Sequence, residues 1–245
     1  IWHNDPNKKD RRYDYFFHLG FTRDEKKRIS FSTSFGNLIQ EKDEYYAQIR
    51  KLLNRYDAIS LREKSAIDYL KKNYGINATH VLEPVLIAPK KLWEDLAEKS
   101  KLNFNENYIF SYILDPTAEK RKLIKSFSEK TELKSINALD GFSANYEVNK
   151  AKLNLENTLP NIWAADLLKG FKEAEYVITD SFHGMCFALI FNKPFMVVAN
   201  YGRGIERFKS ILGMCGLENR LIDIKDIDNL SYADFLERVD YGYVN

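Results

Sequence analysis

The chain has 245 residues, of which 44% are hydrophobic and 29% charged, and its formal net charge is +2. This is the composition of a globular protein with one large or two ordinary domains, and so small a net charge gives no reason to expect a nucleic-acid partner. No run of 18 apolar residues predicts a transmembrane segment, and the two cysteines, Cys186 and Cys215, have no metal-ligand spacing.

The first hundred residues alternate between strand-like and helical patterns. An aromatic patch at 13–19 is strand-like, and the alternating segment 28–36 ends in a glycine turn. This alternation predicts parallel βαβ units. Further strands are expected at 57–61 and 80–82, and helices at 42–54 and 62–73.

The alternation pauses in a polar stretch at 99–107 and then starts again. Asp115-Pro116 predicts the start of a helix, because proline is favoured at the first helical position. We therefore expect an α/β protein with Rossmann-like domains at 1–102 and 103–245, facing each other across a cleft. In the second domain, strands are expected at 108–114, 133–138, 176–179 and 195–199, helices at 116–131, 164–173, 204–213 and 232–239, and a loop at 139–157.

The segment around His183 is the most informative one. A buried strand pattern is followed by the polar turn Thr179-Asp180-Ser181 and by an apolar helix that carries His183 at its start. In an open α/β sheet, ligands bind outside the carboxyl ends of the strands, and the first amides of a helix attract anions. Asp180 or Ser181 can cap this helix. His183 is therefore a candidate acid/base or anion ligand, and the alternative is a core or capping histidine.

Arginines follow two other predicted strands. Arg62 and Glu63 open one helix, while Asn200, Arg203 and Arg207 lie in a glycine-containing loop and the helix after it. An arginine in such a place can hold a carboxylate or phosphate through two parallel hydrogen bonds. The alternatives are a surface ion pair for Arg62 and a solvated loop for the second group.

Three other polar features, at Ser34, Glu83 and the lysines from Lys120 to Lys125, can be explained by structure as well as by function. Ser34 lies in a polar turn that can donate hydrogen bonds to a sugar or an anion, or can cap the next helix. Glu83 ends a strand, either as a base or as a solvated carboxylate. The lysines from Lys120 to Lys125 are expected on a solvated helix face, opposite Leu123 and Ile124.

Taken in chain order, these segments resemble the polysaccharide pyruvyl transferase family. The resemblance covers nearly the whole chain and is most specific around His183, where Thr179 to Gly184 precede Asn192-Lys193-Pro194-Phe195. Ile1-Trp2 resembles the end of a family motif whose first residues precede this chain, so the first domain is expected to be incomplete. The less specific segments are Ile59-Ser60-Leu61-Arg62-Glu63, Val81 to Leu86, and Arg207-Phe208. In the second of them, family members more often have an Asp-Pro pair where this chain has Glu83-Pro84.

The resemblance implies two Rossmann-like domains of the GT-B type and a transfer from phosphoenolpyruvate to two sugar hydroxyls, which forms a cyclic ketal and releases phosphate. It implies that Arg62, Arg203 and Arg207 bind the donor and that His183 is the acid/base. Neither a cofactor nor a metal is implied, and the location is cytoplasmic. A lipid-linked acceptor and peripheral contact with the inner face of the membrane stay open. The other substrate-binding candidates are Glu63, Ser34, Ser181 and Asn200.

Two other functions stay open from the sequence. The first is a nucleotide-sugar-dependent glycosyltransferase of similar architecture, in which the same helix start would bind a diphosphate. The second is a non-catalytic sugar-binding protein that keeps the cleft without the chemistry.

Overall fold

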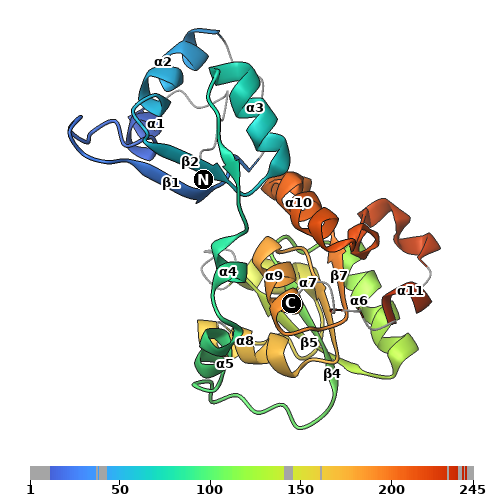
Figure 1. The fold of residues 1–245 in the computed structure, drawn as a ribbon. Helices are drawn as coiled ribbons and strands as arrows, with labels where there is room; N and C mark the ends of the chain where they lie inside the picture. Colours follow the sequence, from blue (N-terminus) through green and yellow to red (C-terminus); the bar gives the residue numbers. More distant parts are fainter. Residues whose placement is uncertain are drawn as a thin grey trace. The chain divides into compact units, whose positions relative to one another are not determined.

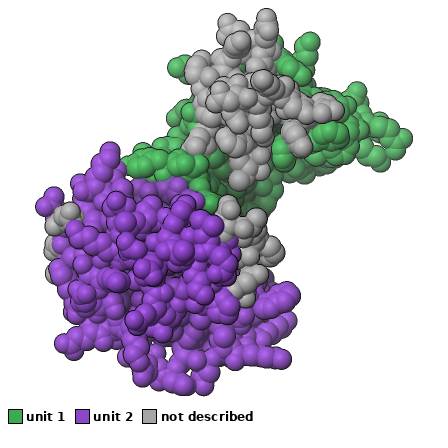
Figure 2. All heavy atoms as spheres, turned by 180° about the vertical axis from the view of Figure 1, so that it is seen from behind, with its two compact units in different colours: residues 1–87, 201–214 green, residues 88–200, 215–245 purple. Residues whose placement is uncertain are grey.

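The computed structural model describes residues 12–36, 38, 43–140, 146–160, 162–230, 232–236, 239 and 241. The Ile1-Trp2 motif lies outside these residues. The chain forms two compact units, coloured separately in Figure 2. Unit 1 comprises 1–87 and 201–214, and unit 2 comprises 88–200 and 215–245.

Unit 1 is built on a three-stranded parallel sheet in the order β1-β2-β3 (Figure 1). One face is covered by two amphipathic helices, which bury Ile59 and Leu61 against Ile49, Leu53 and Leu70. The second of these helices ends at Gly75, whose φ of 70° is favourable for glycine. The elements are α1 (Arg12–Phe17), β1 (Ile29–Thr33), α2 (Asp43–Leu53), β2 (Ala58–Leu61), α3 (Lys64–Tyr74), β3 (Thr79–His80), α4 (Pro84–Ile87), η1 (Tyr201–Arg203) and α10 (Ile205–Cys215).

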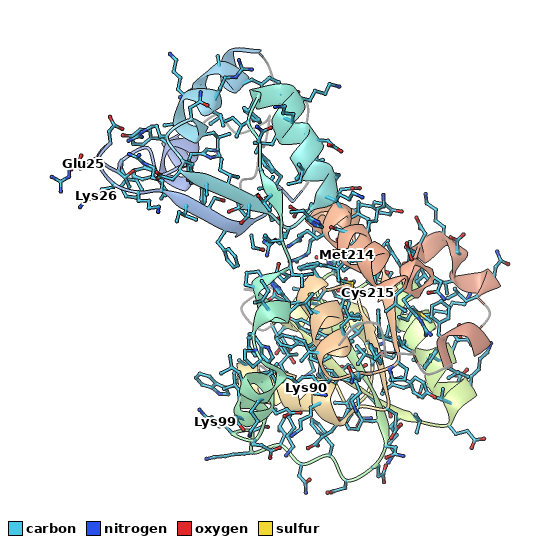
Figure 3. The ribbon with its side chains drawn as sticks, viewed as in Figure 1. Glu25, Lys26, Lys90, Lys99, Met214 and Cys215 are labelled. Atoms are coloured by element: carbon cyan, nitrogen blue, oxygen red, sulfur yellow. The ribbon has the colours of Figure 1, made fainter. Side chains whose placement is uncertain are left out.

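Unit 2 is built on a five-stranded parallel sheet in the order β5-β4-β6-β7-β8. Its central strands β4 and β7 are buried along almost their whole length and are mainly apolar, as expected where helices cover both faces of a parallel sheet. The elements are α5 (Lys90–Ala97), β4 (Tyr108–Ile113), α6 (Ala118–Thr131), β5 (Lys134–Leu139), α7 (Tyr146–Leu153), α8 (Ala164–Glu173), β6 (Tyr176–Thr179), α9 (Phe182–Ile190), β7 (Phe195–Val198), η2 (Glu218–Arg220), β8 (Leu221–Ile222), η3 (Ile224–Asn229) and α11 (Ala233–Leu236). Lys90, at the start of α5, and Lys99, shortly after its end, are labelled in Figure 3.

Strand β4 shows this two-sided burial directly. Ile109 and Ile113 belong to the core cluster formed with α6, while the Phe110 ring meets Phe171 of α8 at 5.0 Å between centroids. Because side chains alternate between the faces of a strand, the two helices cover opposite faces of the sheet. The chain leaves β4 toward β5 on one side and the sheet continues with β6 on the other. The carboxyl ends of β4 and β6 therefore flank the point where ligands bind in open α/β sheets.

The expected α/β class is confirmed, since each of the two compact units is built on a parallel sheet, but two expectations about single elements differ from the structure. The aromatic patch at 13–19 contains helix α1 instead of a strand. A helix, α7, lies in the segment expected to be a loop.

The division of the chain also differs from the expected boundary near residue 103. It falls after Ile87, and the segment 201–214 joins unit 1. The reason is a contact far apart in the sequence: the Ser210 hydroxyl donates to the Arg62 carbonyl at 3.2 Å and accepts from the Lys64 amide at 3.3 Å. Figure 3 labels Met214 and Cys215, between which the chain passes to unit 2 again.

Candidate active site

In unit 1, polar side chains gather at the carboxyl ends of the three parallel strands. Ser34 follows β1, Arg62 and Glu63 follow β2, and Glu83 lies shortly after β3. The Ser34 hydroxyl donates to Glu63 Oε1, and Arg62 Nη1 donates to Glu83 Oε2. Together with Arg207 of α10, these residues are called the arginine cluster below.

Glu63 is the most deeply buried acid of the arginine cluster, with 1% of its surface exposed. Burial raises the pKa of its carboxyl, and the Ser34 hydrogen bond and the charges of Arg62 and Arg207 oppose that rise. Its second oxygen, Oε2, has no hydrogen-bond partner within the described residues. A buried carboxyl with one unused oxygen is unusual and points to a partner that binds there.

Glu83 differs from its expected role as a solvated carboxylate. It is 2% exposed and forms an ion pair with Arg62, whose side chain is 13% exposed. Both charges are therefore largely removed from water, and the carboxylate fixes the direction of the guanidinium.

The loop before α10 reaches the turn after β1. Gly204 has a φ of +90°, and a Cβ placed on it would lie 2.9 Å from the Gly36 carbonyl oxygen. Glycine is therefore needed at 204 for both its conformation and this close approach. Arg203 is exposed, and Arg207, 9% exposed, donates to the Arg203 carbonyl.

In unit 2, Asp180 organises the carboxyl ends of β4 and β6. Its fully buried carboxylate accepts from the Leu114 and Asp115 amides at 2.6 and 3.0 Å and from Lys120 Nζ at 2.6 Å. Asn200 Nδ2 donates to Asp115 Oδ2 at 2.7 Å and lies 3.5 Å from Asp180 Oδ2. We call these groups the Asp180 network.

The Asp180 network gives Lys120 and Asn200 structural roles that differ from those expected from the sequence. Lys120 does not lie on a solvated face: it is 6% exposed and neutralises Asp180. Asn200 is 7% exposed and binds Asp115. The sequence signal that could have revealed the role of Lys120 is Asp180, because a carboxylate between an apolar strand and an apolar helix needs a cation or several amides.

Helix α9 begins directly after Asp180 and presents His183. The Ser181 hydroxyl caps it by accepting from the Gly184 amide at 3.2 Å. Gly184 allows α9 to approach β6, because a Cβ there would lie closer than 3.0 Å to Thr179 Oγ1. His183, the second helical residue, is exposed while most of its helix is buried. The structure therefore does not place His183 in the core, and its imidazole lies at a helix start that favours anions.

The structure thus groups the sequence-predicted residues into two sets, one in each unit. Ser34, Arg62, Glu63 and Arg207 belong to the arginine cluster, with exposed Arg203 beside it, while Ser181, His183 and Asn200 belong to unit 2. Within the described residues, no three His, Cys, Asp or Glu side chains are placed to hold a metal ion. The same part of the chain has no helix that is long and apolar enough to cross a membrane.

Comparison with known proteins identifies the family. The family model described as polysaccharide pyruvyl transferase matches residues 2–201, which is most of the chain. The chain belongs to the polysaccharide pyruvyl transferase family. A search of curated proteins gave no match.

Two solved structures are similar to this chain over most of its length. One is a putative UDP-N-acetylglucosamine 2-epimerase from Listeria monocytogenes, with 13% identity over 93% of this chain and a TM-score of 0.49. The other is the wall teichoic acid polymerase TagF, with 11% identity over 89% of this chain and a TM-score of 0.43. The chain covers 65% and 59% of their respective lengths.

Proposed function

We propose that the protein transfers a pyruvyl group from phosphoenolpyruvate to two hydroxyls of a saccharide and forms a cyclic ketal. Family membership supports pyruvyl transfer to a polysaccharide. The observation that carries the donor assignment is the arginine cluster, in which Arg62 and Arg207 lie with Glu63 at the ligand-binding edge of a parallel sheet.

Phosphoenolpyruvate suits such a place because it carries a carboxylate and a phosphate. Planar guanidinium groups bind both kinds of anion through paired hydrogen bonds. In this proposal Arg62 and Arg207 bind the donor from inside unit 1. Exposed Arg203, on the adjoining turn, adds a third positive charge.

His183 is the proposed acid/base. Two sugar hydroxyls each form a bond to the central carbon of the donor, the bond from that carbon to the phosphate oxygen breaks, and phosphate leaves. One hydroxyl proton ends on the former methylene carbon, which becomes a methyl group, and the other leaves with phosphate. An exposed imidazole at a helix start can take a proton from a hydroxyl and deliver one to carbon.

The proposed reaction needs neither a nucleotide nor a cofactor. We place it in the cytoplasm, where phosphoenolpyruvate is made, and leave the acceptor as a saccharide that is free or lipid-linked. Ser181 and Asn200 serve the acceptor side indirectly, the first by fixing the start of α9 and the second through the Asp180 network.

A thermal-shift titration tests the donor assignment. The protein is titrated with phosphoenolpyruvate, UDP, CMP and phosphate, since a ligand that binds only the native state raises the melting temperature. We expect a saturable rise with phosphoenolpyruvate that Arg203→Ala weakens, while Arg23→Ala, an exposed arginine of the same unit, leaves it unchanged. A shift with UDP or CMP alone would instead favour a nucleotide-sugar glycosyltransferase.

A further inference from the structure

The arginine cluster is electrically balanced before any donor binds. It contains two buried carboxylates, Glu63 and Glu83, and two arginines, Arg62 and Arg207. Adding a donor with a carboxylate and a phosphate to this set brings in an excess of negative charge, which the exposed Arg203 offsets only in part. In surroundings so poor in water, that excess is costly unless a cation or a proton compensates for it.

Glu63 is the member that can accept the proton. Glu83 is engaged with Arg62 by a direct ion pair. Glu63 accepts from Ser34 at Oε1, and its Oε2 has no hydrogen-bond partner among the described residues. The groups facing it are Ser34 from the end of β1, Arg62 beside it, and Arg207 from α10.

We propose that Glu63 takes up a proton from solvent when phosphoenolpyruvate binds, which frees Arg62 and Arg207 from its negative charge. The protonated Oε2 then becomes a hydrogen-bond donor where the carboxylate had only an acceptor. Glu63 is thus a positioning residue that adjusts the charge of the donor site. This inference rests on the proposed function, because it takes phosphoenolpyruvate as the donor.

The direction of the Glu63 pKa agrees with this geometry. Burial already raises the pKa of the carboxyl before the donor arrives, and a nearby anion raises it further. Glutamine imitates the neutral acid in shape and polarity. Glu63→Gln is therefore expected to fold with an unreduced melting temperature at neutral pH.

Calorimetry of phosphoenolpyruvate binding in buffers with different heats of ionisation tests the proposal, because the dependence on buffer gives the number of protons taken up. The donor phosphate itself titrates near neutral pH, so the informative quantity is the difference between proteins. We expect the wild type to take up more protons than Glu63→Gln, by an amount approaching one per donor bound. Glu206→Gln, on α10, is the control and should behave like the wild type.

Ser34→Ala gives an independent test that does not depend on the glutamine variant folding. Removing the Ser34 hydroxyl removes a hydrogen bond that stabilises the Glu63 carboxylate, so its pKa rises further. The pH at which proton uptake is largest should therefore move upward, and an unchanged pH profile would contradict the proposal.

The outcomes separate this inference from the function on which it rests. If phosphoenolpyruvate binds and Glu63→Gln takes up as many protons as the wild type, the proton acceptor is not Glu63, although the donor assignment stands. If the wild type gives no heat with phosphoenolpyruvate at saturating concentration and no thermal shift, both are overturned.

Discussion

His183 combines exposure with a place at the start of a buried helix. Because its side chain contributes little to the core, we expect His183→Ala to keep its melting temperature. Loss of a general acid/base lowers turnover by about 100- to 10,000-fold. The measurement is ketal-bound pyruvate in the polysaccharide of cells that carry the variant as their only copy. Near-normal pyruvate content would remove His183 from the chemistry.

The Arg62–Glu83 pair makes a prediction about stability. Arg62→Ala removes the arginine that pairs with the Glu83 carboxylate, which is 2% exposed, and we expect a loss of about 3 kcal/mol in the free energy of unfolding. The double variant, with both residues changed to alanine, should be less destabilised than the sum of the single changes. Strict additivity in denaturant unfolding would show that the two charges do not depend on each other.

At the residue scale, the sequence predicted where the site residues lie in the fold better than it predicted which side chains they pair with. Arg62 and His183 follow strand patterns, and strand ends meet at one edge of a parallel sheet, so their places could be inferred. The partner of Arg62 lies 21 residues away and that of Lys120 lies 60 residues away. Nothing local marks either pairing, which is why Glu83 and Lys120 were expected to be solvated.

Helix α9 depends on the glycine that follows His183. In Gly184→Ala the new methyl group would overlap Thr179 Oγ1, which donates to the Tyr112 carbonyl at 2.6 Å. Overpacking of this kind costs about 1–3 kcal/mol. Chemical denaturation of the single variant should show that loss. Thr179→Ala should cost less stability in the Gly184→Ala background than in the wild type. If the losses of the two single variants simply add in the double variant, the contact between the two residues is contradicted.

Helix α6 is tied to the sheet by the buried Lys120. Lys120→Met leaves the Asp180 carboxylate with its backbone amides but without a cation, and we expect a loss of about 3 kcal/mol or more in stability. Lys125→Met, an exposed lysine of the same helix, is the matched control and should change stability by about 0.5 kcal/mol or less. Equal effects of the two variants in urea unfolding would contradict a role for the ion pair.

At the element scale, the central strands of unit 2 could be predicted because burial on both faces gives short, mainly apolar segments. Helix α1 could not, because aromatic residues such as Tyr15 and Phe16 are common in strands and the segment is too short for a helical period to appear. The attachment of α10 to unit 1 depends on Ser210 reaching Arg62, a contact that no local pattern reveals.

At the scale of the whole molecule, we expect stability to depend on pH because His18 of unit 1 is buried. It is 2% exposed, and burial lowers its pKa from 6.5 to about 4. The unfolded chain binds the proton first as pH falls, so stability is fully present above pH 6.5 and is lost between 6.5 and about 4. The loss amounts to about 3 kcal/mol. In His18→Gln the urea midpoint should fall less over this range, and parallel curves would refute the assignment.

The two sets of candidate residues belong to different units, so the donor and acid/base roles can be tested separately. Changes in the arginine cluster should alter donor binding, while His183→Ala should leave donor binding intact and stop the chemistry. Calorimetry with phosphoenolpyruvate on both kinds of variant makes this distinction.

We propose that the pyruvyl group of phosphoenolpyruvate ends as a sugar ketal, with His183 as the acid/base. The most direct test incubates the protein in D₂O with ¹³C-labelled phosphoenolpyruvate and polysaccharide precursors from the producing cells, followed by NMR. We predict a labelled ketal methyl group that carries one deuterium, with phosphate released in equal amount, and neither product with His183→Ala. Unchanged phosphoenolpyruvate in the presence of these acceptors, with consumption of a nucleotide sugar instead, would contradict the account.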